Sequence, residues 1–177
     1  QTFISIVRIA STNLMDIIKQ KTSFEKNSTL YEQDFYGWTQ QQAKLLREGT
    51  LNELDFVNLA EEIESLGKQQ RQELRNRLGI LLGHLLKWQC QPSKPSKSWF
   101  VTLREQRREI GYLLTENPSL KPYLPEALHK GYQSGIDLAI RETSLTDQDF
   151  STECPYTLEE VLDTEFFPGE PSDTFPN

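Results

Sequence analysis

Apolar side chains recur at helical spacing along most of this chain, and the first such stretch opens on a capping-box pattern. Thr29 and Glu32 have the separation at which a hydroxyl and a carboxylate satisfy free N–H groups at a helix start. Gly49 supplies a stop signal. We therefore expect a first helix between these points. Its apolar stripe consists of Tyr31, Phe35, Trp38, Leu45 and Leu46.

A second apolar stripe keeps one phase from Phe56 to Trp88. Because the phase does not change along it, the pattern predicts one long helix from about Asp55 to Cys90. Residues 68–73 are polar throughout, so we expect that part of the helix to be exposed or to bend. The stripe consists of Phe56, Leu59, Ala60, Ile63 and Leu66, and then of Leu74, Leu78, Leu81, Leu82, Leu85 and Trp88.

Pro92 and Pro95 cannot continue that helix, and further helices are expected after them. Two of these helices span about 96–117 and 125–143. A short one over about 157–163 begins with another capping box. No stretch alternates apolar and polar residues for long enough to predict a strand. The fold class is therefore all-α: a four-helix bundle with one long helix and a short extra C-terminal helix.

Two glycines interrupt the apolar pattern of the fourth predicted helix. Gly131 and Gly135 both lower helix propensity. We expect them to be there because they permit the backbone of a neighbouring helix to approach closely.

At 177 residues the chain is long enough for one domain with its own core. We expect a helical-bundle domain over 29–168, an N-terminal extension over 1–28 and a frayed tail over 169–177. The only methionine is Met15, and the recognisable patterning begins after it. The residues before Met15 are therefore predicted to be dispensable.

The cellular compartment is predicted from two features of the sequence, its apolar runs and its cysteines. No apolar run approaches the roughly 18 to 20 residues that span a bilayer, so no membrane partner is expected. Cys90 and Cys154 offer neither a disulfide framework nor the spacing of metal ligands. We expect free thiols in a cytoplasmic protein.

The net charge of −7 is unevenly distributed. From Thr143 onward there are nine acidic residues and no lysine or arginine, so the rest of the chain carries 19 basic and 17 acidic residues. The chain before Thr143 is thus mildly basic and the segment from Thr143 onward is acidic. This division affects which partners the protein would attract.

His84, Lys87 and Asp34 are the candidate catalytic residues. An imidazole titrates near neutrality, so His84 has the chemistry of a metal ligand or a general base. With carboxylates such as Asp34, Glu105 or Glu109 it would suit a metal-assisted phosphodiesterase. The structural alternative is a hydrogen-bonded histidine at the edge of the core. Lys87 projects away from the apolar stripe and is expected either to extend its amine to solvent or to pair with a neighbour's carboxylate.

A basic face on the third predicted helix is the candidate binding site. Lys97, Arg104 and Arg108 fall within about 40° of one another, with Lys94 in the preceding linker and Arg107 at the flank. Such a face suits contact with nucleic-acid phosphates. The alternative is a solvated helix face whose charge nearby glutamates balance.

No metal site or cofactor is expected. Glu61, Glu62 and Glu64 spread over about 160° of a helix, so they do not converge on one ion. The chain contains no Glu-x-x-His pair, no phosphate-binding loop and no dinucleotide fingerprint. A non-enzymatic protein is favoured over an enzyme.

Several motifs together resemble a cyanobacterial family catalogued as domain of unknown function twenty-nine, over residues 31 to about 168. The resemblance implies an all-helical fold and a cytoplasmic bacterial protein, and it brings no established activity. The matching segments are Tyr31-x-x-Asp34-Phe35-x-x-Trp38, Leu45-Leu46-Arg47-x-Gly49, Leu54-Asp55-x-x-x-Leu59-x-Glu61-Glu62-Ile63-Glu64-x-Leu66-Gly67, His84-Leu-Leu-Lys87-Trp88, Ser98-Trp99, Arg104-x-Gln106-Arg107, Asn117-Pro118-Ser119-Leu120 and Cys154-Pro155-Tyr156.

The leading functional prediction is a binding or adaptor module that acts through helix surfaces. Its expected partner is another protein or a second copy of the chain, because amphipathic helices that protrude often pair. Nucleic-acid binding and a phosphodiesterase centred on His84 are the alternatives.

Overall fold

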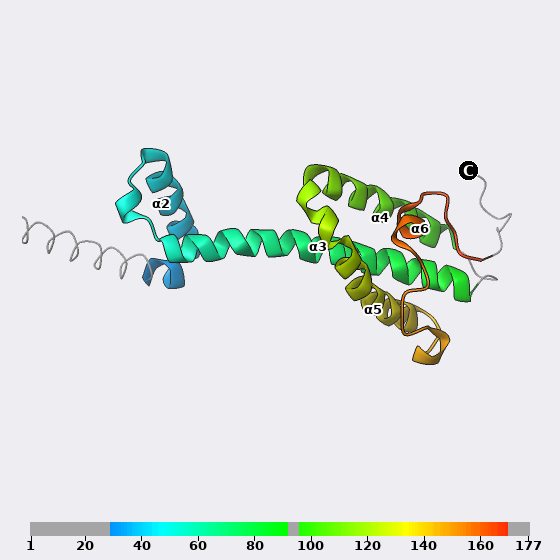
Figure 1. The fold of residues 1–177 in the computed structure, drawn as a ribbon. Helices are drawn as coiled ribbons and strands as arrows, with labels where there is room; N and C mark the ends of the chain where they lie inside the picture. Colours follow the sequence, from blue (N-terminus) through cyan, green and yellow to red (C-terminus); the bar gives the residue numbers. More distant parts are fainter. Residues whose placement is uncertain (1–28, 92–95, 170–177) are drawn as a thin grey trace, which may run out of the picture. The chain divides into compact units, whose positions relative to one another are not determined.

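The computed structural model describes residues 29–91 and 96–169, and the regular structure of these residues is helical (Figure 1). The all-α helical bundle is confirmed. The extension over 1–28, Lys94 and most of the 169–177 tail lie outside the described residues, and so does the prediction about Met15. None of the described helices is long and apolar enough to cross a membrane. The elements are α2 (Phe35–Glu48), η1 (Leu51–Glu53), α3 (Phe56–Cys90), α4 (Lys97–Glu116), η2 (Pro118–Tyr123), α5 (Leu124–Glu142), η3 (Asp147–Asp149) and α6 (Leu158–Leu162).

The chain divides into two compact units, and the boundary lies between Leu66 and Gly67. This boundary falls inside α3, whose range confirms the predicted long helix. The single domain over 29–168 stays a prediction, and the contacts of the chain gather into these two units. The physical reason is the polar stretch that begins at Lys68, because exposed polar side chains contribute nothing to a core.

In the first unit a polar network joins α2 to the start of α3. The buried Trp38 donates its indole Nε1–H to Oδ2 of Asp55 at 3.2 Å. The backbone N–H of Asp55 donates to Oε1 of Gln42 at 2.9 Å. The Asp55 carboxylate also accepts from the backbone and side-chain N–H groups of Asn58, so it caps α3. Gly49, with a φ of 70°, ends α2 as predicted.

The start of α2 corrects the sequence prediction. Residues 29–33 are already helical, so Thr29 does not begin the helix that contains Trp38. The helix breaks at Asp34, whose Oδ1 accepts from the N–H of Gly37 at 2.9 Å and caps α2. Phe35 and Leu46, which were expected to face inward, are exposed. The described residues of the first unit therefore do not cover the whole stripe of α2.

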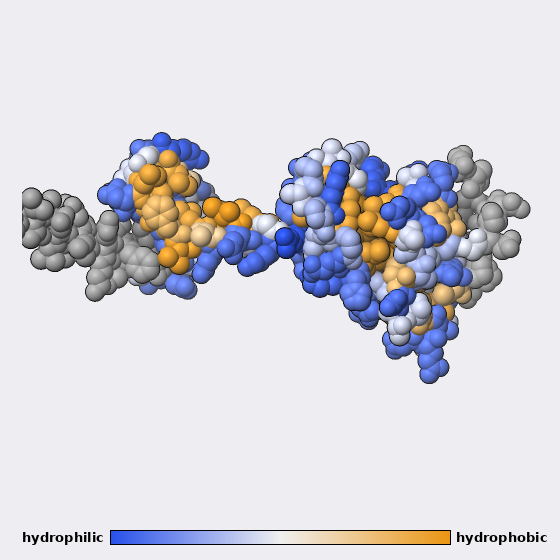
Figure 2. Space-filling model, in the orientation of Figure 1, coloured by the Kyte–Doolittle hydropathy of each residue, from blue (hydrophilic) through white to orange (hydrophobic). Residues whose placement is uncertain are grey.

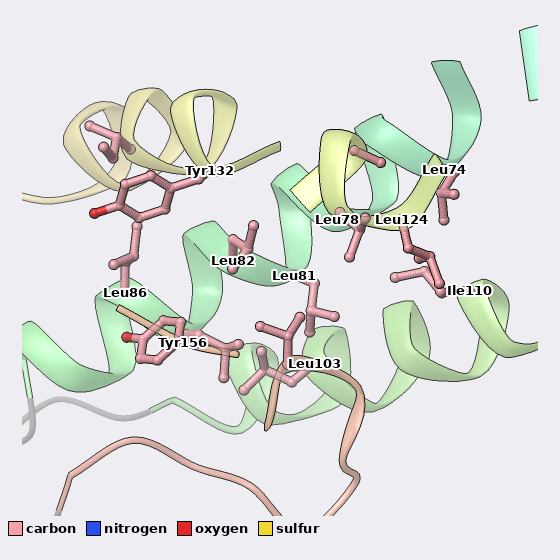
Figure 3. Close-up of a cluster of buried hydrophobic side chains, with 14 of the residues drawn as sticks. Leu74, Leu78, Leu81, Leu82, Leu86, Leu103, Ile110, Leu124, Tyr132 and Tyr156 are labelled. Carbon is pink, nitrogen blue, oxygen red and sulfur yellow. The ribbon is translucent and has the colours of Figure 1, made fainter. Parts of the chain in front are cut away.

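The second unit has a continuous apolar core built by α3, α4, α5 and the C-terminal segment (Figure 3). Leu74, Leu78 and Leu81 of α3 are fully buried, and Leu103 of α4 and Tyr132 of α5 pack into the same cluster. The predicted stripe is therefore an inward face along this part of α3.

Two pairs of glycines allow α3 and α5 to cross closely. A Cβ placed on Gly131 would lie 3.1 Å from the backbone N of Gly79, and one on Gly135 would lie 2.9 Å from that of Gly83. The predicted role of Gly131 and Gly135 is confirmed. Their counterparts on α3 were not identified from the sequence.

Candidate functional site

The first unit exposes a row of large apolar side chains along α3. Phe56, Leu59, Ile63 and Leu66, here called the exposed seam, are separated by three, four and three residues. That spacing is the heptad pattern by which one helix packs against another. Phe56, Ile63 and Leu66 are 62%, 67% and 60% exposed, and Leu59 is half-buried. Among the residues that the structure describes, no segment covers these three side chains, so the seam is an open apolar surface.

More apolar surface accompanies the seam. Phe35, Tyr36 and Leu46 of α2 are exposed, as are Leu51 and Val57. Figure 2 shows this surface over α2 and the N-terminal part of α3. The Phe35 ring is held in place, because it stacks on Trp38 at a centroid distance of 5.7 Å.

The unit that carries the exposed seam is acidic. Residues 29–66 contain eight acidic and two basic residues. Glu62 accepts a hydrogen bond of 2.6 Å from the Tyr31 hydroxyl. This bond, reinforced by the charge of Glu62, raises the pKa of Tyr31 to about 12. The seam is therefore an apolar strip in a negative field.

Lys87 and His84, two of the candidate catalytic residues, lie close together in the second unit. Lys87 is completely buried, and its Nζ contacts Oε2 of Glu142 at 2.6 Å. The same ammonium lies 4.7 Å from the centre of the Trp99 ring. The expected pairing with a neighbour's carboxylate is present, whereas extension to solvent is not. Sequence reasoning did not identify Glu142 and Trp99 as its partners.

His84 is 8% exposed, and its Nδ1 has no hydrogen-bond partner among the described residues. Burial, and then the charge of Lys87, lower the pKa of His84 to about 4, although Glu142 opposes the shift. The imidazole is therefore uncharged near neutrality. Asp34 belongs to the first unit, where it caps α2.

The basic face of α4 is smaller than the sequence suggested. Lys97, Arg104 and Arg108 are exposed as expected, and Lys94 lies outside the described residues. Arg108 also contacts Oε1 of Glu109 at 3.3 Å, which partly balances its charge.

Arg107 is a correction, since it does not lie on an exposed face. Its side chain is buried, and its guanidinium donates to the carbonyl oxygens of Val161, Thr164 and Phe166 at 3.0, 3.3 and 2.7 Å. It also lies 5.5 Å from the centre of the Phe167 ring. Arg107 thus fastens the C-terminal segment to α4. No sequence motif indicates this role, because the backbone carbonyls of an irregular segment leave no pattern of residue types.

Carboxylates, thiols and imidazoles are the side chains that would hold a metal ion. Within residues 29–91 and 96–169, no three such side chains converge in a way that could hold a metal ion.

The comparisons with known proteins agree with the motif pattern. A family model described as Domain of unknown function DUF29 matches residues 30–167. Neither a curated protein nor a solved structure matches the chain. The family resemblance drawn from the motifs is confirmed.

Proposed function

The chain belongs to the DUF29 family, and we propose that it is a docking module that binds a basic amphipathic helix of a partner protein on its exposed seam. The observation that carries the proposal is the exposure of Phe56, Ile63 and Leu66, each more than half open to solvent at heptad spacing.

The apolar surface itself supports a docking role. Burying one such side chain releases about 1.5–3 kcal/mol. Contiguous apolar patches of this kind are uncommon on monomeric proteins and mark interaction sites. Phe35, Tyr36 and Phe56 add aromatic rings, the side chains that most often dominate binding energy.

The negative charge of the first unit indicates what kind of helix would bind to the seam. In heptad pairing, the charges beside the seam select the partner. With Phe56 and Ile63 at a positions, Glu62 falls at the g position beside the seam, and residues 29–66 carry a net charge of −6. A second copy would bring the same negative charge to the interface, whereas lysines and arginines beside the partner's apolar stripe would be attracted.

Two synthetic helical peptides test this proposal on the full chain. Both have leucine at the a and d positions of three heptads, and they differ in carrying lysine or glutamate at e and g. We expect saturable binding of the lysine peptide by fluorescence anisotropy, weakening as salt increases, and at least about tenfold weaker binding of the glutamate peptide.

Two variants locate the binding surface. Ile63→Glu should weaken binding of the lysine peptide at least about tenfold, because it places a charge within the seam. Tyr112→Glu is the matched control, since Tyr112 is an exposed apolar side chain of the second unit and its replacement should leave binding unchanged. Equal effects of the two substitutions would contradict the proposal.

Two other outcomes would assign the seam to a different occupant. A dimer in light scattering that Ile63→Glu dissociates would identify a second copy. Peptide binding that occurs only after removal of residues 1–28 would identify the chain's own N-terminal segment. Either result would overturn the proposed partner.

The alternatives rest on weaker support. For nucleic-acid binding, Arg107 is engaged by carbonyl groups, and Arg108 is partly balanced by Glu109. For a phosphodiesterase, burial leaves His84 with a lowered pKa and a weak affinity for protons at neutral pH.

A further inference from the structure

The second unit contains a shallow pocket in which positive charge converges from two helices. Its volume is about 240 Å³, and α3 and the start of α5 provide most of its lining. Four cations and one carboxylate face it, a net charge of +3 in a chain whose net charge is −7. The cations are Lys68, Arg71, Arg75 and Lys130, and the carboxylate is Glu126.

The two arginines are positioned by neighbouring side chains. The Arg71 guanidinium lies 5.2 Å from the centre of the Tyr123 ring, at the end of η2. This cation–π contact holds the Arg71 guanidinium over the ring. One turn along α3, Arg75 donates to the side-chain oxygen of Gln72. Side chains that are already ordered lose less entropy when a ligand binds.

Glu126 does not remove the positive character of the pocket. Its carboxylate accepts a hydrogen bond of 2.6 Å from Nζ of Lys130. That bond lowers the pKa of Glu126, as do the charges of Arg71 and Arg75. The ionised carboxylate neutralises one cation and leaves an excess of positive charge.

We propose that this pocket binds a small phosphorylated molecule through its phosphoryl oxygens. Guanidinium groups match phosphate geometry with paired hydrogen bonds. An anion would also relieve the repulsion between Arg71 and Arg75. The volume corresponds to about eight water molecules at roughly 30 Å³ each, which suits a phosphoryl or pyrophosphoryl group with a small organic part. The pocket lies in the second unit, so the proposal does not depend on the docking function.

Calorimetric titration of the full chain with inorganic pyrophosphate, at constant ionic strength, tests the proposal. We expect saturable binding with one pyrophosphate per chain. Arg75→Gln should weaken it at least about tenfold, whereas Arg104→Gln, which removes the same charge from the exposed face of α4, should not. Without pyrophosphate, Arg75→Gln should melt at the same or a higher temperature, because it removes like-charge repulsion and keeps the core intact.

Three results would overturn this assignment. Binding that does not saturate, or that both substitutions weaken equally, would show that pyrophosphate binds non-specifically to positive charge on the surface. A single-stranded oligonucleotide that binds at least about a hundredfold more tightly, and loses affinity with Arg75→Gln, would identify the pocket as part of a nucleic-acid surface.

Discussion

In the second unit α3 buries Leu74, Leu78 and Leu81 completely, whereas in the first unit the same helix leaves Phe56, Ile63 and Leu66 largely exposed. Both groups belong to one stripe with one phase. The difference shows that periodicity identifies an apolar face but does not say what covers it. Along the second half of α3 the chain supplies that cover, and along the first half we propose that a partner does.

The two units are also held together differently. The second unit joins segments that are distant in sequence, through its apolar core and the bonds of Arg107 to carbonyls more than fifty residues away. The first unit rests on Trp38, Leu45, Leu54 and the polar network around Asp55. A small unit of this kind can present an open surface because its own fold requires few apolar contacts.

Replacing Arg107 is expected to cost more stability than replacing His84 or Asp55. Arg107→Met should leave the carbonyls of Val161, Thr164 and Phe166 without their donor and reduce the free energy of unfolding by about 3 kcal/mol. Urea titration measures this loss. Arg108→Met, on the exposed side of α4, is the control and should change stability by about 0.5 kcal/mol or less. Similar losses would mean that Arg107 does not fasten the second unit.

His84 should make the second unit sensitive to acid. Its pKa is about 4 when folded and 6.5 ordinarily, so the unfolded chain binds more protons between these values and stability falls as pH falls. We expect a loss of about 2 kcal/mol between pH 7 and pH 5 from this group. Urea titrations of the wild type and of His84→Gln at both pH values isolate the contribution of His84 to this loss. The same pH dependence in both proteins would count against the assignment.

A smaller, local effect is expected in the first unit. Asp55→Ala removes the acceptor of the Trp38 indole and the cap of α3, a loss of about 1–2 kcal/mol. Because the network belongs to the first unit, amide hydrogen exchange should accelerate about tenfold in α2 and remain unchanged in α5. Equal acceleration in both helices would show that the units do not unfold separately.

Local signals in the sequence predicted much of this fold. The range of α3, the αL conformation of Gly49 and the capping box of Thr157 and Glu160 all depend on residues within one or two turns. Gly131 and Gly135 were identified because glycine within a helix requires a packing reason.

The candidate sites were harder to predict because they depend on tertiary contacts. Arg107 resembles an exposed cation in sequence and is buried only because a distant segment folds over it. Lys68 and Lys130 are sixty-two residues apart, so nothing local indicates that they line one pocket. The exposure of Ile63 likewise could not be predicted, because it depends on which other segments pack against α3.

Alanine substitutions at two leucines of α3 test the central claim most directly. Urea titration of the full chain should show that Leu78→Ala, in the core of the second unit, loses about 2–5 kcal/mol of unfolding free energy. Leu66→Ala, on the exposed seam, should change it by about 0.5 kcal/mol or less. Comparable losses at the two positions would contradict the account, because they would mean that the chain itself covers both halves of the stripe.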